Sequence, residues 1–173
     1  VEKPEHPDIL TLPWRQEEIV LAVPARYQIN RELADYAYDF DAFLRRNEPG
    51  FRKKPVPLIR FLNVPFLLLN ERNDLNARTR AICAHAGFTP KVRLVLTQMM
   101  TAYYLVCEGQ GVTLLRDAIP EYVTPNDNVI FYKLDDPLAF RSIYLSYPQK
   151  KLPAIHRELI EYLSEKGSED KNA

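Results

Sequence analysis

Long hydrophobic runs, cysteine pairs and an excess of charge of one sign are all lacking in this chain of 173 residues. The longest strongly apolar stretch, 64–69, is far shorter than the roughly 18 residues that suggest a membrane span, so no membrane partner is expected. Lysine and arginine together number 23, as do aspartate and glutamate, and a net charge of zero disfavours direct binding to nucleic acid. Two cysteines cannot form a disulfide framework, which favours a reducing, cytoplasmic location.

The first residues show no sign of a targeting segment. Residues 1–8 contain neither a cationic region nor an apolar core, which argues against a signal peptide. They are typical of a loop inside a protein, so we expect the chain to be a piece of a longer one. Its composition, 46% hydrophobic and 27% charged, is that of a globular domain.

Short apolar runs alternate with helical patterns along the chain. This alternation predicts right-handed βαβ crossovers and an α/β fold with a mainly parallel sheet. The tail, 167–173, has no apolar anchor, and we expect it to be disordered. The expected strands are 16–23, 64–69, 91–96, 111–115, 129–134 and 141–147, and the expected helices are 75–86, 98–108 and 153–166.

Capping residues mark where these helices begin and end. Asn73 or Asp74 can cap the first helix, and Thr97 can cap the second. Gly87 follows the first helix where a left-handed backbone conformation is needed to end it. The closing helix lines up apolar residues on one face, namely Leu152, Ile155, Leu159, Tyr162 and Leu163.

The segment 25–55 is rich in Tyr, Asp, Arg and Asn, and its apolar residues recur at helical spacing. We favour an amphipathic insertion on the surface. The alternative is a lid over a binding site, which long connections sometimes form. The residues at helical spacing are Leu33, Tyr36, Ala37, Phe40, Phe43 and Leu44.

The candidate catalytic and metal-binding residues are poorly placed for chemistry. Cys83 and His85, two residues apart on a helix, lie about 200° apart around its axis and cannot bind one metal ion together. Cys83 and Cys107 lie toward helix C-terminal ends, where the helix dipole disfavours a thiolate nucleophile. Asp135 and Asp136 precede a proline and are typical of a turn. We therefore expect no enzyme, no metal and no other cofactor.

Two strand-to-helix joints, 70–74 and 97–99, provide a candidate binding edge. Ligands of parallel α/β sheets bind beyond the carboxyl ends of the strands. Backbone N–H groups at the start of a helix suit a carboxylate or another anion, although these residues are also explained as ordinary helix caps. The side chains available at the two joints are Asn70, Glu71, Asn73, Thr97, Gln98 and Met99.

Four motifs, in the right order, resemble LysR-type transcriptional regulators. QEEIVLAVP at 16–24 is similar to the family's EE-(L/I)-V-L-V-V-P strand. VPFLLL at 64–69, with AHAGFTPKV at 84–92, is similar to its PF-I-L … AGF-x-P-x-V segment. LVCEGQGVTLL at 105–115 is similar to LV-x-x-G-x-G-(V/I)-x-L-L, and 141–147 with the helix that follows resembles the returning strand and closing helix.

This resemblance implies a ligand-sensing, effector-binding domain with the type II periplasmic-binding-protein-like fold, in which two crossing strands join two lobes. Residues 1–24 and 141–166 would supply the crossing strands and a remnant of the first lobe, and 25–140 a complete, Rossmann-like second lobe. The winged helix-turn-helix DNA-binding domain would lie outside the chain. The sequence departs from the family where Leu115-Arg116 replaces Leu-Pro, and in the length of the insertion 36–55.

The resemblance also implies partners and site residues. A small metabolite would bind between the lobes and modulate DNA binding and transcription by the full-length protein, and 75–86 with 91–96 would form the contact of a homodimer or homotetramer. The alternative is a transporter's solute-binding protein with the same fold, and a third reading is an enzyme using Cys107 or Asp135 and Asp136. The implied effector contacts are Asn70, Glu71, Arg72, Asn73, Gln98, Met99 and Phe140.

Overall fold

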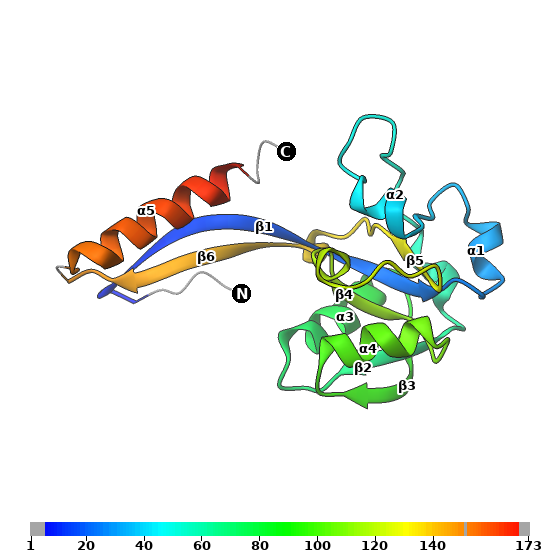
Figure 1. The fold of residues 1–173 in the computed structure, drawn as a ribbon. Coiled ribbons are helices and arrows are strands. Elements are labelled where there is room, and N and C mark those ends of the chain that lie inside the picture. The colour runs from blue at the N-terminus through cyan, green and yellow to red at the C-terminus, as the bar shows by residue number, and fades with distance from the viewer. Residues whose placement is uncertain (1–5, 151, 170–173) are drawn as a thin grey trace. The chain divides into compact units, whose positions relative to one another are not determined.

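The structure, a computed structural model, describes residues 6–150 and 152–169 (Figure 1). The chain divides into two compact units: unit 1 consists of Val1–Glu17 and Phe140–Ala173, and unit 2 of Glu18–Ala139. The strands are β1 (Ile9–Pro24), β2 (Pro65–Leu69), β3 (Lys91–Leu96), β4 (Thr113–Arg116), β5 (Val129–Tyr132) and β6 (Phe140–Pro148). The helices are α1 (Ile29–Glu32), α2 (Phe40–Leu44), α3 (Asp74–His85), α4 (Met99–Cys107) and α5 (Ala154–Glu169), with short 3₁₀ turns η1 (Leu58–Phe61), η2 (Ile119–Tyr122) and η3 (Pro137–Ala139).

The strands of unit 2 combine parallel and antiparallel pairing. β2 and β3 are parallel, and a parallel bridge between Phe66 and Val112 brings the chain leading into β4 alongside β2. The part of β1 in this unit is antiparallel to β4 on one side and to β5 on the other. The predicted parallel pairing is therefore present among β2, β3 and the approach to β4, while β1 runs opposite to β4 and β5.

Gly111 allows β2 and the approach to β4 to come close together. A Cβ atom at this position would lie 2.7 Å from the carbonyl oxygen of Pro65, closer than real Cβ contacts. The same approach is held by Val112, whose N–H donates to Pro65 O at 2.9 Å and whose carbonyl accepts from Leu67 N at 2.8 Å. A side chain at 111 would push these backbones apart.

The two long helices of unit 2 begin differently. Asn73 caps α3, its Oδ1 accepting from the N–H of Leu75 at 3.0 Å, and Gly87 follows the helix with a φ of 88°, both as predicted. Thr97 is not the cap of α4, and that prediction is wrong. Gln98 occupies the N-cap position in an extended conformation, and its side chain makes no capping hydrogen bond. α4 therefore begins at Met99, one residue later than a cap at Thr97 requires.

The segment 25–55 contributes to the core of unit 2. Phe43 is fully buried, with its ring centroid 4.5 Å from that of Phe131 on β5. The backbone of Tyr38 exchanges two hydrogen bonds with Phe131, of 3.0 and 2.9 Å, and its hydroxyl accepts from Lys53 N at 2.6 Å. The segment is therefore more than a surface insertion, because its aromatic face is internal, and a role as a lid stays a prediction.

Unit 1 is built from β6, the first part of β1 and α5. β6 pairs with β1, and Glu17 forms a buried ion pair with Arg141. Trp14 Nε1 donates to the carbonyl of Leu163 on α5 at 2.8 Å. The apolar face predicted for α5 is largely exposed, since Ile155, Leu159 and Tyr162 expose 67%, 52% and 53% of their surface.

α5 continues to Glu169, so the first residues of the predicted disordered tail, 167–169, are helical, and 170–173 lie outside the described residues. Within the described part of the chain, no helix has both the length and the apolar character needed to cross a membrane.

Candidate functional site

One edge of the sheet in unit 2 gathers the polar residues that follow its strands. β2, β3, β4 and β5 point the same way, so their carboxyl ends meet at this edge, where 70–73 and 97–98 follow β2 and β3. β1 runs in the opposite direction and enters unit 2 here, at Glu18. We call this edge, from Glu18 to the residues after the four strands, the rim.

A hollow of about 400 Å³ opens at the rim beside the start of α3. Asn76 lies in the first turn of α3, is buried, and donates through Nδ2 to the carbonyl of Leu69 at the end of β2. Its Oδ1 accepts from Arg80 Nε at 3.0 Å, which orients the guanidinium of Arg80. The hollow is lined by Asn70, Glu71, Arg72, Asn76, Arg80 and Val95.

The charges of this hollow favour an anion. Arg72 and Arg80 supply two guanidinium groups against the single carboxylate of Glu71, so the lining has a net charge of +1. The start of α3 adds the positive end of a twelve-residue helix dipole, which the carboxylate of Asp74 in the first turn partly offsets. Planar guanidinium groups bind carboxylates and phosphates through paired hydrogen bonds. The arrangement suits binding and contains no nucleophile.

The structure brings together only some of the predicted site residues. Asn70, Glu71 and Arg72 line the hollow, whereas the side chain of Asn73 is engaged as the cap of α3. Thr97 and Gln98 are exposed and Met99 packs partly against the core, and none of the three lines the hollow. Phe140 is half-exposed at the start of β6, in unit 1.

A cluster of partly buried ion pairs at the rim was not predicted from the sequence. Lys133 Nζ lies 3.3 Å from Glu18 Oε2, and Arg46 Nη2 donates to Asp117 Oδ2 at 2.7 Å. Asp117 Oδ1 also accepts from the backbone N–H of Glu18 at 3.2 Å. Burial raises the pKa of Glu18, against the opposing effect of Lys133. Glu18, Asp117 and Lys133 are far apart in the sequence, and the antiparallel pairing of β1 with β4 and β5 brings them together.

Neither cysteine is placed to act as a thiolate nucleophile. Cys83 is buried, and this burial raises the pKa of its thiol to about 12. Burial also raises the pKa of the half-buried Cys107. Across residues 6–150 and 152–169, no three His, Cys, Asp or Glu side chains are grouped so that they could hold a metal ion.

Comparison with known proteins now identifies the family. A family model described as "LysR substrate binding domain" matches residues 1–168. The chain belongs to this family. The resemblance in its motifs is thereby confirmed, as is its class: an effector-binding domain of LysR-type regulators rather than a transporter's solute-binding protein. This family is a regulatory one and is not enzymatic.

The relatives agree with this assignment. The chain is 33% identical over 104 residues to "Uncharacterized HTH-type transcriptional regulator YcgK" of Bacillus subtilis (strain 168). The matched region covers 59% of this chain and 31% of that protein. The chain thus spans about a third of that curated relative.

Solved structures share the fold at low sequence identity. The regulatory domain of CcmR from Synechocystis PCC6803, in complex with 2-PG, is 16% identical, with a TM-score of 0.69 over 96% of this chain and 70% of that one. The effector-binding domain of BenM with its effector benzoate is 19% identical, with a TM-score of 0.68 over 99% and 68%. The predicted α/β fold of the type II periplasmic-binding-protein-like class is confirmed.

Proposed function

We propose that the chain senses a small anionic metabolite for a full-length LysR-type regulator and, in response, modulates DNA binding and transcription in the cytoplasm. DNA would be contacted by a separate winged helix-turn-helix domain. The chain would have no catalytic activity of its own. The observation that carries this proposal is the net positive hollow at the start of α3, which brings Asn70 and Arg72 together with Arg80.

The proposed ligand class rests on charge. A carboxylate in the hollow would meet Arg72 and Arg80, with the N–H groups at the start of α3 nearby. Benzoate, the effector bound by BenM, is a compound of this class. The proposed contacts are Asn70, Glu71, Arg72, Asn73, Thr97, Gln98, Met99 and Phe140, with Asn76 and Arg80 added from the lining of the hollow.

The proposed signal is a change in the balance between two arrangements of the full-length protein. An effector can shift such a balance only by its difference in affinity for the two arrangements. We retain the predicted division into crossing strands with a first-lobe remnant, 1–24 and 141–166, and a second lobe, 25–140. In this arrangement the effector would bind between lobes.

Calorimetric titration of the full-length protein with small carboxylates, benzoate and shikimate included, tests the proposal. We expect at least one to bind, and Arg72→Ala or Arg80→Ala to weaken that binding roughly tenfold or more, because each removes a charged hydrogen-bond donor. Arg31→Ala, which removes an exposed arginine on α1, is the control and should bind as the wild type does. Failure of every carboxylate, or equal affinity in all three variants, would contradict the proposal.

A further inference from the structure

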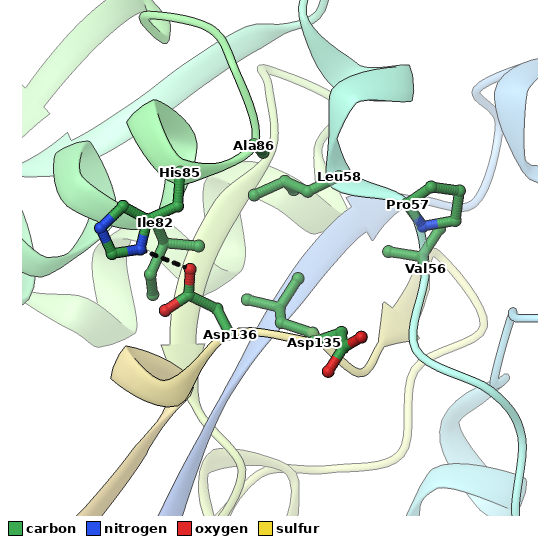
Figure 2. Close-up of a pocket in the computed structure, with 9 residues that line it drawn as sticks. Val56, Pro57, Leu58, Ile82, His85, Ala86, Asp135 and Asp136 are labelled. Atoms are coloured by element: carbon green, nitrogen blue, oxygen red, sulfur yellow. Dashed lines mark hydrogen bonds and ion pairs between the residues drawn. The ribbon is translucent and has the colours of Figure 1, made fainter.

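A second cavity of about 260 Å³ lies in unit 2, between the end of α3 and the segments 56–58 and 134–136 (Figure 2). Val56 approaches it from the segment before η1 and Leu58 from the start of η1. Ile82 approaches it from α3, and Leu134 from the residues after β5. These apolar side chains form its walls. None of its lining residues is shared with the hollow at the rim.

The buried carboxylate of this cavity, Asp136, is held in a fixed position. The side chain of Asp136 is only 9% exposed, and its Oδ2 lies 2.8 Å from Nδ1 of His85. Its Oδ1 accepts from the backbone N–H of Leu138 at 2.8 Å, so both carboxylate oxygens are anchored. In Figure 2 the carboxylate of Asp136 points toward His85, whereas the exposed carboxylate of Asp135 points away from it.

The cavity is negative in either protonation state of its histidine. Its lining contains Asp135 and Asp136 but no lysine or arginine. Two carboxylates with a neutral His85 sum to −2, and with a protonated His85 to −1. His85 is also the last residue of α3, where the helix dipole presents its negative end. An anion is therefore repelled from this cavity.

We propose that this cavity is a binding site for a small organic ammonium ion with a compact apolar body. The body would pack against Val56, Leu58 and Ile82, and the ammonium group would face the carboxylate of Asp136, with Asp135 adding its negative charge at the edge of the cavity. Concave apolar walls with a few converging polar groups are typical of small-molecule sites. A bare metal ion fits poorly, because the described side chains do not supply three ligands. The site is separate from the proposed effector site and takes the opposite charge.

A matched set of three probes tests the charge preference: cyclohexylammonium, cyclohexanol and cyclohexanecarboxylate. Methyl NMR spectra of the full protein report binding through the signals of Ile82 and Leu134. We expect saturable shifts of these signals with cyclohexylammonium, binding of cyclohexanol at least roughly tenfold weaker, and no shifts with cyclohexanecarboxylate. Equal binding of cyclohexylammonium and cyclohexanol would overturn the proposal, as would shifts confined to other methyl groups.

Substitutions test the carboxylates. Asp136→Asn is expected to weaken cyclohexylammonium binding roughly tenfold or more, and the exposed Asp135→Asn roughly threefold. Asp127→Asn, an exposed aspartate outside the cavity, is the control and should bind as the wild type does. If Asp136→Asn fails to fold, Asp135→Asn alone decides, because its side chain is exposed. Unchanged affinity in the folded variants would overturn the proposal.

Discussion

Asn73 shows, at the scale of one residue, how a cap shapes the loop beside it. Its side-chain oxygen accepts from Leu75 N, and its own N–H donates to the carbonyl of Asn70 at 3.0 Å. The loop 70–73 is thereby closed into a turn at the start of α3. The neighbouring side chains of Asn70 and Arg72 remain available to line the hollow.

Asn73→Ala is expected to lower the free energy of unfolding by about 1 kcal/mol, because it removes the capping bond to Leu75 N. Gln98→Ala is the matched control, since Gln98 occupies the same cap position on α4 without a side-chain bond, and it should change stability by less than about 0.5 kcal/mol. Urea unfolding measures both. Equal losses would show that the cap bond of Asn73 contributes little.

Glu18 is expected to make the stability of the protein depend on pH. Burial raises the pKa of its carboxyl above the ordinary value of 4.5, so folding favours the protonated form. The associated stability is present below the unfolded pKa and is lost as the pH rises through the folded one. The free energy of unfolding of the wild type, minus that of Glu18→Gln, should therefore fall between acidic and neutral pH. Urea unfolding at a series of pH values measures it, and a rise would mean that the ion pair with Lys133 dominates.

At the scale of elements, the segment 25–55 shows how short helices are held by their aromatic residues. α1 and α2 have only four and five residues, too few to be stable by themselves. α2 is fixed because Phe40 and Phe43 are buried, the second against Phe131 on β5. Packing onto the sheet, rather than helix propensity, therefore gives this segment its structure.

Phe43→Ala should lower the free energy of unfolding by about 3–5 kcal/mol, the usual cost of removing a fully buried ring. Phe51→Ala is the control within the same segment. The ring of Phe51 is half-buried beneath the guanidinium of Arg45 at 3.9 Å, and losing it should cost only about 1 kcal/mol. Thermal or urea unfolding compares them, and similar small losses would mean that the segment is not part of the core.

Elements with strong local signals were predictable from the sequence. The apolar run of β2, the periodic face of α3 and the capping role of Asn73 follow from neighbouring residues. The direction of β1 is set by pairing with strands about a hundred residues away, which no local pattern records. The same holds at the site: the loop 70–73 was predictable, whereas the ion pairs of Glu18 and Lys133 depend on that pairing.

At the scale of the whole molecule, β3 favours the predicted contact between copies, because among the described residues it lies at the edge of the β2–β3 sheet. In that sheet β3 pairs with β2. Its apolar side chains are exposed, with 39% of Val92, 39% of Leu94 and 57% of Val95 accessible. Exposed apolar edge strands are prone to pair with another chain. Helix 75–86 and strand 91–96 therefore remain the predicted contact of a homodimer or homotetramer.

Leu94→Asp should lower the oligomeric state, because a charge would be placed in this contact. Leu62→Asp is a closely matched control, since Leu62 is 40% exposed but lies outside 75–86 and 91–96. Sedimentation of the protein carrying each change measures the mass of the assembly. An unchanged mass for Leu94→Asp, or an equal decrease for both variants, would contradict the predicted contact.

Gly111 limits which amino acids this position of the chain can tolerate. Two polypeptide backbones meet there with no room for a methyl group, since a Cβ atom would lie 2.7 Å from Pro65 O. A saturation library selected for soluble protein should return glycine almost alone at this position, although the residue carries no side chain with which to recognise anything. Intolerance of substitution at 111 would thus record a steric limit of the scaffold and should not be mistaken for a mark of ligand recognition.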